Sequence, residues 1–263
     1  MRLRNRDLLR SGLRTFLLQA VWNFERMQNV GWAWCMLPVL RRLYPGRQEL
    51  AQATKRHLEY FNTHPYLAGV ILGCAARVEE KAALGEGATA AEVTAVKMGM
   101  MGPLAALGDS FFWATLRPLA ALLGVLMAFF AQAEGGSWAP WGVAAFLLAF
   151  NLPHLLVQSL GAAFGYAAGD AIVPLLRKVE VPVLVHRMQA AGLVLLGTLL
   201  AGLQGFHPPH EEGMAGGLVV AAFGLLAFLL VRRKVRISHI LWGALFCSIL
   251  ASYIYPSPFW GQP

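Results

Sequence analysis

The pattern of hydrophobic and polar positions changes once along this chain, near residue 118. Before that point apolar stretches are short and interrupted by charged residues, and after it long uncharged runs follow one another. A run of about 20 apolar residues crosses a bilayer as a helix, whereas a run of about ten does not. The pattern therefore predicts an all-α polytopic membrane protein with about five transmembrane helices, preceded by shorter helices in the N-terminal half.

The first two apolar segments are not expected to span. Residues 8–30 place apolar positions three and four residues apart among charges, which predicts an amphipathic helix in the membrane interface or against other helices. Residues 31–40 are apolar, but we expect Pro38 and the arginines that follow to end this segment.

The next segments lead towards a polar turn and a second short apolar run. Residues 47–61 predict a polar helix, and residues 66–76 predict a re-entrant or buried helix that stops at Arg77. Asn62 or Thr63 is expected to cap the second of these helices, with Pro65 in its first turn. Thr89 and Glu92 have the spacing of a capping box, so a further helix is expected to begin there.

Residues 98–118 form the most unusual stretch, because they are apolar yet contain Asp109 and Arg117. Glycine and proline interrupt the stretch at Gly99, Gly102, Pro103, Gly108 and Pro118. Both residue types disfavour a helix interior, so we expect a broken-helix motif of two pieces joined by opened backbone that protein or a water-filled cavity satisfies. Asp109 and Arg117 are roughly two helical turns apart and would face the same cavity. The alternative is a structural ion pair, or Asp109 and Ser110 capping the second piece.

The second half reads as a transmembrane bundle over residues 119–255. Spans are expected at residues 118–133, 135–169 with a kink at 151–154, 188–206, 213–231 and 237–255. Lysine and arginine cluster at 170–187 and 232–236, which places these loops and the N-terminus in the cytoplasm and the C-terminus outside. Small residues at Gly161, Gly165 and 167–169 predict close helix packing. We expect one membrane domain over 1–263, with 1–97 mainly cytoplasmic, interfacial or re-entrant.

Composition removes several classes of function. The chain is 57% hydrophobic, only 14% charged and carries a net charge of +8. Its basic residues lie in clusters between apolar runs instead of forming one stripe, so nucleic-acid binding is not expected. The three cysteines are widely spaced in apolar surroundings and predict neither a disulfide framework nor a zinc site. The N-terminal arginines precede no long apolar run, which favours a basic arm near anionic headgroups over a cleaved signal peptide.

Catalytic motifs are missing from the sequence. Of seven histidines only His207 and His210 are close together, and the two prolines between them prevent a helical ligand pair. No phosphate loop, nucleophile elbow or metalloprotease motif occurs. We therefore expect no catalytic residue, no metal and no cofactor.

The polar residues that remain in apolar settings suit a polyhydroxylated ligand. Carboxylates and amides accept hydroxyl protons, and aromatic rings cover the apolar faces of a sugar. The candidate substrate-binding residues are Glu25, Asn62, Thr63, Asp109, Trp113 and Arg117. The alternative is that each of them satisfies a turn or pairs locally.

Four strings in one order carry a family resemblance. They are Trp22-Asn23-Phe24-Glu25-Arg26-Met27-Gln28, Arg41-Arg42-Leu43-Tyr44-Pro45, Arg56-His57-Leu58-Glu59-Tyr60-Phe61-Asn62-Thr63-His64-Pro65, and the block from Met101-Gly102-Pro103-Leu104-Ala105 through Gly108-Asp109-Ser110-Phe111-Phe112-Trp113 to Leu116-Arg117-Pro118. In these strings the chain resembles the IID component of the mannose/fructose/sorbose family of the bacterial phosphoenolpyruvate-dependent sugar phosphotransferase system.

The resemblance implies a subunit of the bacterial cytoplasmic (inner) membrane that pairs with a IIC subunit to bind and translocate a hexose. Phosphoryl transfer in such systems runs through histidines of the cytosolic IIA and IIB components, so the IID subunit is not expected to be phosphorylated or to catalyse a reaction itself. An assembly of several IIC–IID pairs with broken, re-entrant helices is also implied. Family members carry a longer polar insert between the third and fourth spans, where this chain has only residues 207–212. A non-transporting, regulatory relative is the alternative that this difference leaves open.

Overall fold

The computed structural model describes residues 2–133, 139–178 and 180–205, and these residues form helices joined by short connections. Contacts divide the chain into Met1–Gly197, which is described below, and Thr198–Pro263, of which only the end of the last helix, to Gly205, is described. In chain order the elements are α1 (Asn5–Arg14), η1 (Thr15–Leu17), α2 (Asn29–Leu43), α3 (Arg47–His57), η2 (Pro65–Leu67), α4 (Ala68–Leu84), α5 (Ala90–Gly108), η3 (Asp109–Leu116), α6 (Arg117–Ala133), α7 (Ala139–Ala168), η4 (Gly169–Ala171), α8 (Ile172–Lys178) and α9 (Val181–Gly205).

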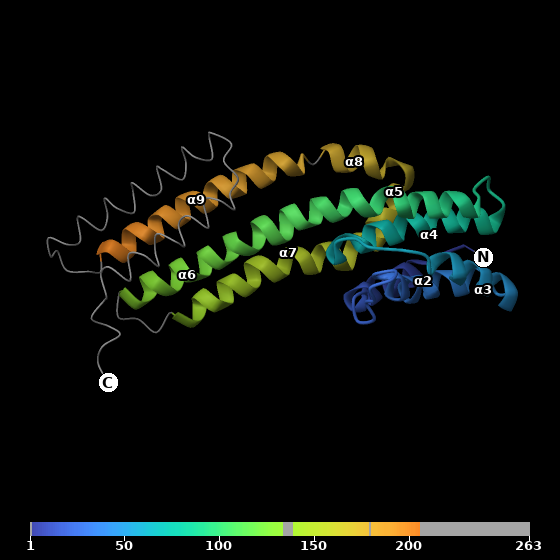
Figure 1. The fold of residues 1–263 in the computed structure, drawn as a ribbon, viewed down its shortest axis with the longest axis horizontal. Helices are drawn as coiled ribbons and strands as arrows, with labels where there is room; N and C mark the ends of the chain where they lie inside the picture. Colours follow the sequence, from blue (N-terminus) through green and yellow to red (C-terminus); the bar gives the residue numbers. More distant parts are fainter. Residues whose placement is uncertain (1, 134–138, 179, 206–263) are drawn as a thin grey trace. The chain divides into compact units, whose positions relative to one another are not determined.

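Three stretches of the described residues are long and apolar enough to cross a membrane. They are Ala90–Phe130, Pro140–Ala168 and Pro174–Leu199. They overlap the first three expected spans, and α6 and α7 run side by side (Figure 1). The fourth and fifth expected spans, the loop at 207–212 and Cys247 lie outside the described residues.

The expectation of two helical pieces joined by opened backbone at 98–118 is wrong. Helix α5 passes through Pro103 and continues without a gap through η3, a π-helical segment, into α6. A proline removes one backbone donor, and a π segment absorbs such a defect by widening the turn and bonding residues five apart. Within η3, the hydroxyl of Thr115 also donates to the carbonyl oxygen of Ser110, five residues earlier, at 2.8 Å. Asp109 and Ser110 therefore lie within a continuous helix and do not cap a new one.

The expected helix over residues 8–30 is only half correct. Helix α1 ends at Arg14, one short turn follows, and residues 18–28 are irregular. The side-chain oxygen of Asn23 accepts a hydrogen bond from the backbone N–H of Arg26 at 2.8 Å, which gives the backbone an alternative to the helix. Residue Met27 then adopts a positive φ of 57°.

Two further helix ends were placed too early by the sequence. Helix α2 passes through Pro38 to Leu43, and α4 passes through Arg77 to Leu84. Tertiary packing explains both, because α2 and α4 lie largely in the core and their neighbours supply the stability that local signals do not. The expectation of a buried helix at 66–76 is confirmed by α4. The capping box of Thr89 and Glu92 is present, and α7 runs through residues 151–154 without a break.

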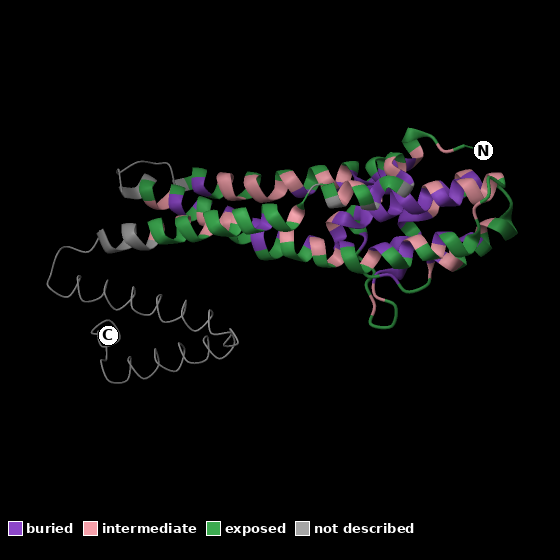
Figure 2. Cartoon of the chain, turned by 90° about the horizontal axis from the view of Figure 1, so that it is seen from above, coloured by how far each residue is buried: buried purple, intermediate pink, exposed green. Residues whose placement is uncertain are grey.

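The core of the described unit depends on the contact between α4 and α7, the most extensive between any two elements. A Cβ atom at Gly73 would collide with the backbone of Ala162, and one at Gly165 would collide with the carbonyl of Val70. The two backbones therefore touch, and the expected close packing at Gly161 and Gly165 is confirmed. Buried residues gather in this N-terminal part of the unit, whereas α6 and α7 are mostly exposed or intermediate further along (Figure 2).

Replacing Gly165 with leucine should therefore prevent correct packing of α4 on α7. We expect the Gly165→Leu variant to lose most of its folded, monodisperse fraction after extraction in mild detergent, as judged by size-exclusion chromatography. Gly99→Ala is the matched control, because a Cβ at Gly99 meets no atom within 4 Å. Equal yields of folded protein from both variants would contradict the assigned contact.

Candidate functional site

The short segment after α3 is held in place by pairing with the loop before α2. The side-chain amide of Gln28 donates to the carbonyl of Thr63 at 2.9 Å, and its oxygen accepts from the Thr63 N–H at 3.1 Å. The backbone N–H of Gln28 also donates to the carbonyl of Phe61 at 2.8 Å. These bonds hold residues 61–63 against the loop before α2, shortly before η2 and α4 begin.

This segment packs against the junction of α5 and η3. The hydroxyl of Thr63 donates to the carbonyl oxygen of Met101 at 3.0 Å. The ring of His64 rests on Gly108, where any Cβ atom would collide with the imidazole. Gly108 therefore serves close packing and not chain reversal.

Aromatic rings surround His64 and join the segment to α7. The imidazole stacks on Phe112, with ring centroids 5.3 Å apart, and lies 4.8 Å from the ring of Trp113. The ring of Tyr66 meets the His64 ring edge-on, with centroids 4.9 Å apart, and stacks on His154 of α7 at 4.3 Å. One aromatic cluster thus links the segment, η3 and α7.

His64 is neutral, and its two nitrogens have different surroundings. Nδ1 accepts a hydrogen bond from the backbone N–H of Tyr66 at 3.3 Å, so His64, and not Asn62 or Thr63, caps η2. Nε2 then carries the hydrogen, is buried and has no hydrogen-bond partner among the described residues. Burial lowers the pKa of His64 to about 4, although the nearby carboxylate of Asp109 acts in the opposite direction.

Asp109, Trp113 and Arg117 are exposed on one side of the long helix. Residues spaced four apart lie on the same face of a helix, so they form a row. Within the described part of the chain no ion pair joins Asp109 to Arg117, so the alternative of a structural pair is not realised. The opposite side, at Leu104, Phe112 and neighbouring positions, is buried in the core.

The structure brings some of the other expected site residues to this row. Asn62 is exposed and Thr63 is buried next to His64, so both lie beside the helix that carries Asp109 and Trp113. Glu25 lies in the loop that pairs with Phe61, but its side chain points to solvent and contacts only Arg26, at 3.5 Å. His64 itself was missed, although it stands in the motif between Asn62 and Pro65.

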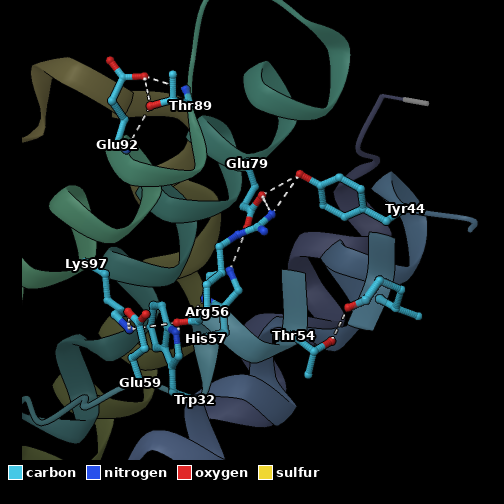
Figure 3. A network of polar contacts seen from close by, with 11 residues as sticks. Trp32, Tyr44, Thr54, Arg56, His57, Glu59, Glu79, Thr89, Glu92 and Lys97 are labelled. Atoms are coloured by element: carbon cyan, nitrogen blue, oxygen red, sulfur yellow. Dashed lines mark hydrogen bonds and ion pairs between the residues drawn. The ribbon is translucent and has the colours of Figure 1, made fainter. Parts of the chain in front are cut away.

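A buried polar network, also missed by the sequence analysis, joins α2, α3 and α4 (Figure 3). The Glu79 carboxylate, which has no exposed side-chain surface, accepts from Arg56 through two bonds of 2.8 Å and from the Tyr44 hydroxyl at 2.8 Å. Nε2 of His57 lies 2.8 Å from the same carboxylate. Both carboxylate oxygens of Glu79 therefore accept hydrogen bonds.

The tautomer of His57 follows from its two partners. The indole N–H of Trp32 donates to Nδ1 at 3.0 Å, so the hydrogen of the neutral ring must sit on Nε2 and point to Glu79. Burial lowers the pKa of His57. Burial raises the pKa of Glu79, but the hydrogen bonds from His57 and Arg56 outweigh that effect and bring it down to about 2.

These arrangements differ in what they are able to do. The network around Glu79 is closed and saturated, so it stabilises the packing of α2, α3 and α4. The row of Asp109, Trp113 and Arg117 is open, charged and aromatic, as expected of a surface that binds a polar ligand or a partner. No group of three potential metal ligands occurs among the residues that the structure describes.

Comparison with known proteins assigns the family. The sequence model described as the PTS system mannose/fructose/sorbose family IID component matches residues 2–209, which is most of the chain. The chain belongs to this IID family. The three helical stretches long and apolar enough to cross a membrane agree with a membrane protein of this family.

Individual IID proteins support the same assignment. The chain is 40% identical over 189 residues to the mannose-specific EIID component of Escherichia coli (strain K12), a match that covers 72% of this chain and 64% of that protein. It is 34% identical to the fructose permease IID component of Bacillus subtilis (strain 168), covering 76% of this chain and 70% of that one. A sorbose-specific EIID component of Lacticaseibacillus casei is 32% identical, with 82% and 81% covered.

Solved structures share the IID fold. One described as the structure of a membrane protein has a TM-score of 0.72 at 32% identity, covering 97% of this chain and 98% of that one. A chain from a cryo-EM structure of the mannose transporter ManYZ with microcin E492 has a TM-score of 0.58 at 31% identity and the same coverage.

Acid should destabilise this IID subunit in two pH ranges. His57 and His64 have folded pKa values below the ordinary 6.5, so the unfolded chain takes up their protons first and stability falls below about pH 6.5. Glu79 has a folded pKa of about 2 against an ordinary 4.5, so the stability it contributes above pH 4.5 is lost as the pH falls towards 2. Thermal unfolding of the purified subunit in detergent, followed from about pH 8 to about pH 3, measures both effects.

Glu79→Gln separates the two ranges. The variant is expected to unfold at a lower temperature at neutral pH, because Arg56 loses its buried partner, and its loss of stability below pH 4.5 should be smaller. The fall near pH 6.5 should remain. An acid profile parallel to that of the unmodified protein would refute the depressed pKa of Glu79.

Proposed function

We propose that this chain is the IID membrane subunit of a mannose-family sugar permease, which forms with a IIC subunit the pathway that binds and translocates a hexose. IIB then phosphorylates the sugar on the cytoplasmic side and is recharged by IIA. Membership of the IID family supports this function, as do relatives named for mannose, fructose and sorbose.

One observation of the structure carries the proposal. Asp109 and Arg117 are exposed on a helix long and apolar enough to cross the membrane, and every stretch of 20 residues within Ala90–Phe130 contains at least one of them. A helix needs about 20 residues to cross, and a charge facing lipid costs about 2.5–3.5 kcal/mol. The row must therefore face another protein or a water-filled path, and a IIC subunit with its sugar provides both.

The residues of the row, together with the neighbouring Asn62, suit binding of both a sugar and a IIC subunit. The Asp109 carboxylate and the Asn62 amide accept sugar hydroxyl protons, the exposed indole of Trp113 covers an apolar sugar face, and Arg117 donates to oxygens of the sugar or of IIC. Thr63 supports the same site from the adjoining segment by holding that segment on α5, whereas the exposed side chain of Glu25 would reach the sugar only from the solvent side.

The proposal includes the topology and assembly expected of this family. The chain crosses the bacterial inner membrane five times, with its N-terminus in the cytoplasm and its C-terminus outside, and several IIC–IID pairs form the complex. The distribution of lysine and arginine supports that orientation. The relatives named as mannose- and sorbose-specific components support a permease subunit and not the regulatory alternative.

The row can be tested first with Asp109→Asn. Losing the charge while keeping the shape should reduce uptake of the transported hexose about tenfold, because hydrogen bonds to a charged acceptor exceed neutral ones by roughly 1 kcal/mol or more. The measurement is phosphoenolpyruvate-dependent accumulation of labelled sugar phosphate in vesicles that contain this chain, its IIC partner and the cytosolic components.

The control for this test is Glu86→Gln, which removes an exposed carboxylate paired with Arg2 across the surface at 3.5 Å. We expect it to leave uptake unchanged. Co-purification of IIC with both variants establishes that the complex is assembled. Full uptake by an assembled Asp109→Asn complex would exclude Asp109 from the pathway.

A further inference from the structure

The imidazole of His64 contains a hydrogen-bond donor for which the described residues provide no acceptor. The side chain is 1% exposed, and Nδ1 is occupied by the backbone N–H of Tyr66. The Nε2–H group is left buried and unpaired among the described residues. Buried polar groups are nearly always hydrogen-bonded in folded proteins, so an exception requires an explanation.

Packing alone does not explain a histidine at this position. A phenylalanine would stack on Phe112 and Trp113 as well as an imidazole does. Capping of η2 needs only an acceptor at the position of Nδ1, which an asparagine side chain supplies. The Nε2–H donor is the property that distinguishes histidine from both.

The nearest groups of the open row complement this donor. Asp109 follows Gly108, the residue on which the imidazole rests, and its carboxylate is exposed and acts electrostatically on His64. The ring of Trp113, 45% exposed, lies against the imidazole. His64, Asp109 and Trp113 are therefore neighbours at the edge of the row, and together they offer a donor, an acceptor and an apolar ring. A sugar hydroxyl both accepts and donates a hydrogen bond, so it needs that combination.

We infer that one hydroxyl group of the transported hexose binds between His64 and Asp109, accepting a hydrogen bond from Nε2–H and donating one to the carboxylate. This inference rests on the proposed function, since it assigns a specificity-determining residue to the same site. The indole of Trp113 turns aside from His64 to admit the hydroxyl, and its ring then lies against the apolar face of the sugar. Because His64 is neutral, it donates this bond throughout the physiological pH range.

Two substitutions of His64 separate the donor from the cap. In His64→Asn the side-chain oxygen takes the place of Nδ1 and still caps η2, but the donor at Nε2 is lost. In His64→Gln the longer amide reaches the position of Nε2 with an N–H group, whereas the cap is weakened. A role in sugar binding and a role in folding therefore predict opposite orders of activity.

The experiment uses the assembled IIC–IID complex in vesicles with the cytosolic components. Labelled mannose, fructose and sorbose are tried first, and the KM for the sugar taken up is measured for each variant. Unlabelled monodeoxy derivatives of that sugar, each lacking one hydroxyl, then compete with uptake. We expect one derivative to compete about tenfold more weakly than the parent sugar, since one hydrogen bond is lost.

The inference requires a defined pattern across the variants. His64→Asn should raise KM about tenfold with little change in kcat, and the penalty for that one deoxy derivative should vanish. His64→Gln should keep a KM near that of the unmodified complex and preserve the penalty. Normal uptake by His64→Asn, with loss of uptake only in His64→Gln, would show that His64 acts as a cap alone and overturn the inference.

Failure of the proposed function has a different signature. If the unmodified complex assembles with IIC but neither takes up nor binds any of the three sugars, the transport function fails and this inference fails with it. If the unmodified complex transports a sugar and all His64 variants share its deoxy profile, transport stands and only the role of His64 is refuted.

Discussion

The rest of the structure depends on the direct backbone contact between α4 and α7. Gly73 and Gly165 allow the two helices to touch, which fixes α4 against a helix long enough to span the membrane. The segment that enters α4 carries His64 and Tyr66, so the same contact sets these rings on Gly108 and His154. In an apolar environment the hydrophobic effect does not drive helices together, and close packing of small residues takes its place. The position of the candidate site is therefore a consequence of helix packing some distance away.

Much of the fold could be predicted from the sequence, because hydropathy averaged over about 20 residues identifies long apolar helices. Long uncharged runs predicted helices that the structure has at the first three expected spans, with different ends, and the capping box at Thr89 marked the start of α5 correctly. Local breaking signals failed at Pro38 and Pro103, where the helices continue. A proline removes one hydrogen bond, and packing on several sides or a π segment compensates for that loss. Sequence signals within a few residues of the proline do not report this compensating packing.

The site was predicted only in part, for a related reason. Charge in an apolar stretch identified Asp109 and Arg117, and the structure places both on the open face. The sequence did not distinguish that face from the buried one, since small and apolar residues occur on both. His64 was missed because the unpaired state of one of its nitrogens appears only when the partner of the other is known. Gly108 was the available signal, but it was interpreted as a helix breaker instead of as space for a ring.

Two buried histidines, His57 and His64, have different roles because their hydrogen bonds differ. His57 has a donor from Trp32 on one nitrogen and the Glu79 carboxylate on the other, so its hydrogen-bonding capacity is filled by the chain itself. His64 is equally buried and equally neutral, yet only one nitrogen is used. Saturation makes the first a rigid part of the scaffold that holds α3 on α4. In His64 the Nε2–H group has no partner among the described residues, and it lies beside the helix that exposes Asp109. A ligand hydroxyl, which both accepts and donates a hydrogen bond, satisfies the two groups together.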